Sequence, residues 1–90
     1  MENVIAKIHN KNDEPVTFSA QSWETVTPSD TTRLAIGQLF VGTGGNIAVL
    51  AKDASSPETF KNVLDGSFLP INVVAVYSTN TTASDILILR

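Results

Sequence analysis

Strand-length runs of β-branched and apolar residues, separated by clusters of turn-forming residues, recur along most of this sequence. Of the 90 residues, ten are Thr, nine are Val and seven are Ile. These side chains are stiff at χ1 and pack well on a pleated sheet. The pattern predicts one all-β domain over residues 1–90: a small antiparallel β-sandwich or barrel of about seven short strands.

The extended segments follow from period-two alternation and from the turn residues between them. By residue number, we expect them at 4–8, 16–20, 23–26, 33–41, 47–51, 59–63, 67–78 and 86–89. The apolar pattern changes phase at Gly37, which predicts a bulge or bend there. Gly42-Thr43-Gly44-Gly45 is a glycine-rich turn, and it predicts a hairpin between the runs that flank it, with at least one glycine at positive φ.

Charge and cysteine content exclude several classes of function. The net charge is −3, and the six Lys and Arg residues are scattered along the chain. Nucleic-acid binding and membrane-surface binding both need clustered cations, so neither is expected. The chain has no Cys, which excludes disulfides and thiolate metal sites. Met1-Glu2-Asn3 lacks the basic and apolar regions of a signal peptide, so none is expected.

Catalytic and metal-binding motifs are also missing from the sequence. His9 is the single imidazole, and the oxygen-rich turn with Asp13 and Glu14 beside it matches no Ca²⁺-loop spacing. The glycines at 42–45 are followed by strand-like Asn46-Ile47-Ala48-Val49 rather than by the Lys-Ser pair and helix of a phosphate loop. No Ser or Thr has a recognisable base partner. We therefore expect no enzyme activity, no cofactor and no metal.

Two apolar features leave two interpretations open. Trp23 stands in a polar neighbourhood, as a partly buried core aromatic or as an interface anchor. The run Ile86-Leu87-Ile88-Leu89 is apolar on both faces, so it forms a strand covered on both sides within the chain or covered on one side by another subunit. The candidate oligomer or capsid interface therefore consists of Trp23, Ile86, Leu87, Ile88 and Leu89.

From about Thr25 onward, several pieces occur in a characteristic order. They are Val26-Thr27-Pro28-Ser29-Asp30-Thr31-Thr32, Phe40-Val41-Gly42-Thr43-Gly44-Gly45-Asn46-Ile47-Ala48-Val49, Thr59-Phe60-Lys61-Asn62-Val63, Leu69-Pro70-Ile71 and Thr79-Asn80-Thr81-Thr82-Ala83, before the apolar C-terminal strand. In this order the chain resembles the small head-spike base and capsid decoration proteins of tailed phages and gene transfer agents.

The resemblance implies a virion structural protein on the outside of a phage-like head, synthesised in the bacterial host cytoplasm. It implies a spike or fibre base, or a cement protein, that contacts the major capsid protein and its own copies as a trimer or pentamer, with a spike or fibre protein as a further partner. Residues 1–22 lie outside the resemblance and are expected to form an attachment arm or an edge strand. The alternative is a free β-sandwich module that recognises a carbohydrate, through Trp23 or Tyr77, or a host protein.

Overall fold

The computed structural model describes residues 19–90, and all regular structure in this part of the chain is β-strand. The strands are β1 (Trp23–Val26), β2 (Gly37–Thr43), β3 (Gly45–Ala51), β4 (Glu58–Val63), β5 (Ser67–Tyr77) and β6 (Ser84–Leu89). The predicted all-β class is thus confirmed, with six strands in the described residues. The segment predicted at 4–8, and 16–18 of the segment predicted at 16–20, lie outside the described residues, whereas Ser19 and Ala20 are not in a strand.

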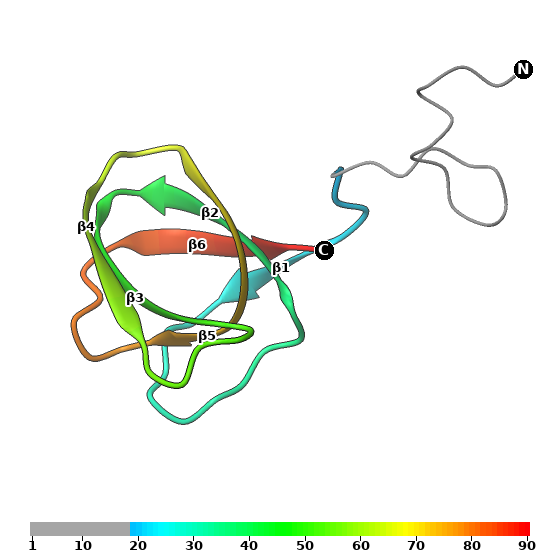
Figure 1. Ribbon diagram of the computed structural model, residues 1–90. Helices are drawn as coiled ribbons and strands as arrows, with labels where there is room; N and C mark the ends of the chain where they lie inside the picture. Colours follow the sequence, from blue (N-terminus) through cyan, green and yellow to red (C-terminus); the bar gives the residue numbers. More distant parts are fainter. Residues whose placement is uncertain (1–18) are drawn as a thin grey trace, which may run out of the picture.

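The six strands form one antiparallel sheet in the order β1-β6-β2-β5-β3-β4. The sheet curls around a core in the manner of a small barrel (Figure 1). The long β5 pairs with β2 through its first half and with β3 through its second half. The first and last described strands, β1 and β6, lie side by side, and within residues 19–90 the other edge of β1 has no partner strand.

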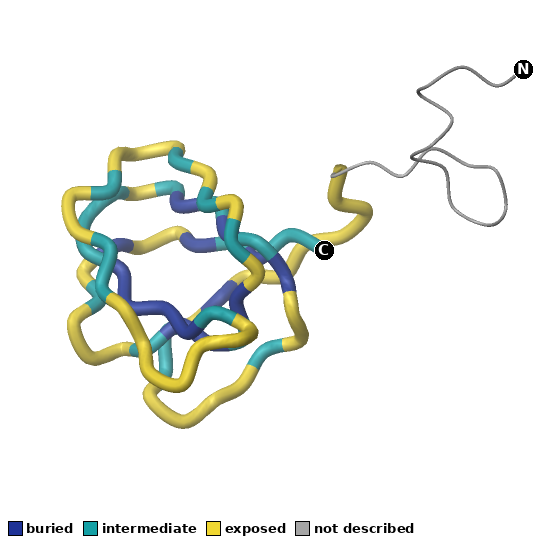
Figure 2. The backbone as a smooth tube through the Cα atoms, viewed as in Figure 1, coloured by how far each residue is buried: buried dark blue, intermediate teal, exposed yellow. Residues whose placement is uncertain are grey.

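The core consists of side chains that point inward from β1, β2, β3, β5 and β6, together with Ala83, and Figure 2 shows the buried positions in dark blue. β4 contributes only the partly buried Phe60 and Val63. Leu39, Ile47, Val73 and Ile88 are fully buried. The complete core cluster is Val26, Leu39, Val41, Ile47, Val49, Val73, Val76, Ala83, Ile86 and Ile88. Burying each such side chain contributes roughly 1.5–3 kcal/mol. No polar or charged side chain is buried in the described residues.

The predicted hairpin at residues 42–45 is wrong. Gly44 alone separates β2 from β3, yet the two strands pair with other partners. The chain turns a corner here, and it passes so close to the end of β4 that a Cβ on Gly44 would lie 2.1 Å from the Val63 carbonyl oxygen. Glycine is therefore required for close approach. Positive φ was predicted correctly at Gly45, where φ is +150°.

The bend predicted at Gly37 is confirmed, since the pairing of β2 with β5 changes register between Gly37 and Leu39. A second register shift places the irregular part of β5 between Val73 and Ala75. For this reason Val73 and Val76, which strict alternation would send to opposite faces, both reach the core.

Short polar side chains connect segments where the strand ladder is interrupted. The Gly44 N–H donates to the Asp65 carboxylate at 2.6 Å. On the next strand, the Asn46 and Ala48 N–H groups donate to the hydroxyls of Thr82 (2.9 Å) and Thr81 (2.8 Å). Because a buried N–H without an acceptor is costly, these threonines stabilise the corner between β3 and β6.

Candidate interaction surface

One surface of the sheet is apolar although it faces away from the core. Residues directly opposite each other in antiparallel strands point to the same side of the sheet. Phe40 lies opposite both Leu87 and Phe68, and Thr25 lies opposite Leu87. In the neighbouring row, Leu89 lies opposite both Trp23 and Gln38. We call this set the outer face: Trp23, Thr25, Gln38, Phe40, Phe68, Leu87 and Leu89.

The outer face divides the sequence-predicted interface residues into two groups. Ile86 and Ile88 point inward and are buried in the core. Leu87 and Leu89 point outward and are half-buried. The two-sided apolar pattern of this strand therefore reflects a core on one side and an incompletely covered apolar surface on the other.

Trp23 belongs to the outer face and is 72% exposed. The interpretation of Trp23 as a partly buried core aromatic is therefore wrong. Sequence analysis missed Phe40 and Phe68, of which Phe68 is 48% exposed. A signal for both was present, because each alternates with core residues of its own strand and so had to face outward.

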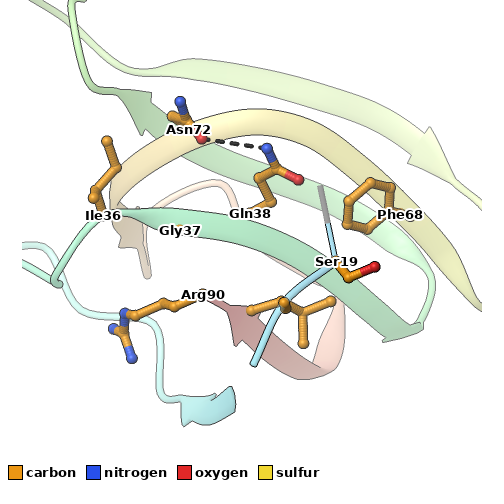
Figure 3. Close-up of a pocket in the computed structure, with 9 residues that line it drawn as sticks. Ser19, Ile36, Gly37, Gln38, Phe68, Asn72 and Arg90 are labelled. Carbon is orange, nitrogen blue, oxygen red and sulfur yellow. Dashed lines mark hydrogen bonds between the residues drawn. The ribbon is translucent and has the colours of Figure 1, made fainter. Parts of the chain in front are cut away.

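A hollow of about 380 Å³ lies at one end of the outer face. Its lining residues are Ser19, Ala20, Ile36, Gly37, Gln38, Phe68, Asn72, Leu89 and Arg90. Figure 3 shows that Phe68 and Ile36 flank Gln38, which donates a hydrogen bond to the Asn72 side chain at 3.3 Å. The lining combines apolar side chains with a few polar groups, as protein-binding surfaces commonly do.

The chain reaches the hollow through residues 19–22. The Gln21 and Ser22 N–H groups both donate to the Arg90 carbonyl, at 2.6 and 3.0 Å, which extends the β1–β6 pairing by one step. The next two residues toward the N-terminus, Ser19 and Ala20, already line the hollow together with Phe68 of β5. The chain therefore enters the described structure across the outer face, from the β5 side toward β1.

Arg90 closes the rim of this surface. Its guanidinium binds the Glu24 carboxylate at 2.9 Å and donates to the Ala35 carbonyl at 3.2 and 3.3 Å. Glu24 lies opposite the core residue Ile88, so this ion pair is formed on the other side of the sheet from the outer face. The seven side chains of the outer face are uncharged, whereas Arg90 supplies a charge at the hollow beside them.

A second hollow, of about 370 Å³, lies elsewhere on the barrel and is lined in part by Asp30, Tyr77, Thr79 and Asn80. The Asp30 carboxylate accepts hydrogen bonds from the Thr79 N–H at 2.9 Å and from the Thr79 hydroxyl at 2.5 Å. These bonds hold the pKa of Asp30 below its ordinary value of 3.8. Trp23 does not line this hollow. Trp23 and Tyr77, the two aromatic candidates for sugar binding, therefore belong to different surfaces.

The residues considered for metal chemistry, His9, Asp13 and Glu14, lie outside the described residues. Within residues 19–90, no group of three or more His, Asp or Glu side chains is arranged to hold a metal ion. The same residues contain no helix long and apolar enough to cross a membrane.

The fold and the outer face together define a small curled β-sheet protein whose exposed apolar surface suits contact with other proteins. Comparison with solved structures agrees with this class. A chain in the structure of the native gene transfer agent capsid, computed with C5 symmetry, is 31% identical and has a TM-score of 0.69. The match covers 99% of this chain and 100% of that chain.

At this identity and coverage the protein belongs to the family of that capsid component, the small capsid-associated proteins of gene transfer agents and phage-like particles. No model of a protein family matches the sequence, and no curated protein sequence matches it.

Proposed function

We infer that the protein is a structural component on the outside of a phage-like head, where it serves as a spike or fibre base or as a cement protein and has no catalytic role. The observation that carries this proposal is the match to a gene transfer agent capsid chain over nearly the whole sequence. This support is an analogy with that capsid component over the whole chain, because a shared fold by itself does not fix a function.

The described residues support a protein that binds rather than reacts. The outer face presents Trp23 and Phe68 to solvent, and such aromatic side chains are enriched at protein interfaces. The polar groups that line the two hollows include a side-chain pair, Gln38 with Asn72, and the Asp30 carboxylate, which Thr79 holds by two hydrogen bonds. The partners are the major capsid protein, other copies of this chain and, for a spike base, a fibre protein.

Mass spectrometry of purified particles tests the proposal directly. We expect the protein in many copies per particle, because structural proteins of symmetric assemblies occur as repeated copies. A membrane-impermeant amine reagent applied to intact particles should label the exposed Lys52 and Lys61, because the protein is placed outside. Absence from particles would overturn the proposal, and failure to label these lysines would overturn the exterior location.

Particles made without the gene separate the two exterior roles. A cement protein stabilises the shell, so its loss should lower the temperature at which the head releases DNA. A spike base seats a fibre, so its loss should remove the fibre and leave shell stability unchanged. The free binding module of the alternative would leave both properties unchanged, and it would remain in the lysate after particles are removed.

A further inference from the structure

We propose that the outer face and the free edge of β1 receive residues 1–18 of a neighbouring copy, so that the copies are linked head to tail by their N-terminal arms. The proposal deepens the proposed function and rests on it for the supply of neighbours, because a capsid protein occurs as many adjacent copies. The proposal names the surface and the segment through which neighbouring copies contact each other.

The receiving surface has a free edge next to an apolar face. In the described residues, β1 pairs with β6 on one side only. Its backbone makes no other hydrogen bond with residues 19–90. A free edge is a template for one more strand, whose backbone supplies the hydrogen bonds while alternate side chains rest on the neighbouring face. Here that face offers Trp23 and Leu87.

The occupant has the matching chemistry. Residues 1–18 include Val4-Ile5-Ala6-Lys7-Ile8, a short run rich in β-branched residues of the kind that favours strand pairing. Eighteen extended residues span about 60 Å. An eleven-residue strand such as β5 measures about 36 Å, so the arm is long enough to reach a neighbouring barrel.

The path of residues 19–22 indicates that the arm on the β1 edge comes from a neighbouring copy rather than from the same chain. Gln21 and Ser22 continue the line of β1 alongside Arg90. Ser19 and Ala20 then line the same hollow as Phe68 and Gln38, on the side of the outer face away from the free β1 edge. Residues 19 and 20 therefore head away from the edge of their own β1, and within residues 19–90 this edge stays available to another copy.

A repeated arm-to-face contact would link the copies into a ring. An arm that contacts a different surface on the next copy is a heterologous contact, and such contacts close into a ring where the rotation between copies allows it. The structure that contains the related chain was computed with C5 symmetry, and a ring of five arm-to-face contacts is compatible with that symmetry.

Disulfide trapping on the purified full-length chain tests the proposal, since the protein has no native Cys to interfere. One set of variants carries a single Cys in the arm, from Val4→Cys to Ile8→Cys. A differently tagged variant carries Thr25→Cys, an exposed position of the outer face. The matched control is Lys61→Cys, exposed on β4 at the other end of the sheet.

We expect mixing and mild oxidation to give a disulfide between the two tagged chains for at least one arm position with Thr25→Cys, and at least five-fold less with Lys61→Cys. Equal trapping at both positions, or none with Thr25→Cys at the highest soluble concentration, would overturn the proposal. So would a disulfide that forms only within one chain carrying both substitutions.

A second variant avoids chemical trapping. Val4→Asp together with Ile8→Asp should reduce the oligomer to a monomer by light scattering and leave the β-type circular dichroism unchanged. An unchanged mass would contradict the proposal. Both experiments use isolated protein, so they are independent of whether the protein is found in particles, and the failure of one proposal is distinguishable from the failure of the other.

Discussion

Asp30 and Thr79 are joined by two hydrogen bonds, one to the backbone N–H of Thr79 and one to its hydroxyl. The loop that carries Asp30 also binds β5 directly, through the Ser29 N–H and the Val76 carbonyl at 2.9 Å. These contacts anchor the long segment between β1 and β2 to the far end of β5. The motif that carries the family resemblance therefore has a structural role at this position.

The Asp30 contact should make stability depend on pH. Its bonds to Thr79 hold the folded-state pKa below 3.8, so the stabilisation is complete above that value and is lost as the pH falls through the lower folded pKa. Asp30→Asn should lower the melting temperature at neutral pH, and the deficit should shrink in acid. Melting curves over a pH series would test this, with the exposed Asp53→Asn as control. A deficit independent of pH would contradict the assignment.

The alternation along β6 predicts unequal effects at adjacent positions. Ile88 is fully buried, so Ile88→Ala should lower the free energy of unfolding by about 2–5 kcal/mol. Leu87→Ala, on the half-buried outer face, should cost clearly less when measured by denaturant unfolding of dilute protein. Similar losses at the two positions would contradict the assignment of Ile88 to the core and Leu87 to the outer face.

The corner at Gly44 should tolerate no side chain. A Cβ there would collide with the Val63 carbonyl oxygen and the Asp65 backbone nitrogen, so Gly44→Ala should cost about 3 kcal/mol or more. Gly66 has φ +76° and open space around it, so Gly66→Ala should cost only the strain of about 1–2 kcal/mol. The comparison is made by thermal unfolding. Equal losses would contradict the requirement for close approach at Gly44.

The Thr81 hydroxyl should matter more than its exposure indicates. It accepts a hydrogen bond from the N–H of Ala48, a residue that is almost fully buried. Thr81→Val keeps the shape but leaves that N–H without an acceptor, which should cost about 1–3 kcal/mol. Thr59→Val is the matched control, because the Thr59 hydroxyl makes no hydrogen bond in residues 19–90. If the two valine variants unfold at the same denaturant concentration, the Thr81 bond contributes nothing.

Local pattern was enough to predict that each strand of residues 19–90 exists and that the chain bends at Gly37, because alternation and turn residues act within a few positions. Strand ends were less accurate: residues 33–36, predicted as strand, are not in one, whereas Gly42, Thr43 and Gly45, predicted as a turn, belong to β2 and β3. It was not enough to predict which strands pair. The turn residues at 42–45 have the composition of a hairpin, yet the chain turns a corner there because β2 finds its partners in β5 and β6. Pairing between distant strands depends on how all the strands pack around the core. A short stretch of sequence therefore does not reveal which strands pair.

The candidate surface was predicted in part. The apolar character of Leu87 and Leu89 was visible in the sequence, whereas the contribution of Phe40 and Phe68 depended on their register with β6 and β2. Trp23 was ambiguous because a tryptophan in a short polar strand fits a core edge and a surface equally well. The position of β1 at the end of the sheet decides between the core and the surface location of this side chain.

The pairing of β1 with β6 has a consequence for synthesis. Glu24 and Arg90, which close this pair, are 66 residues apart, so β1 must wait for β6 to be synthesised before the two strands can pair. Such long-range pairings favour folding in milliseconds to seconds. The outer face, which spans β1, β6, β2 and β5, is therefore complete only after β6 has emerged from the ribosome, and self-assembly through it cannot begin earlier.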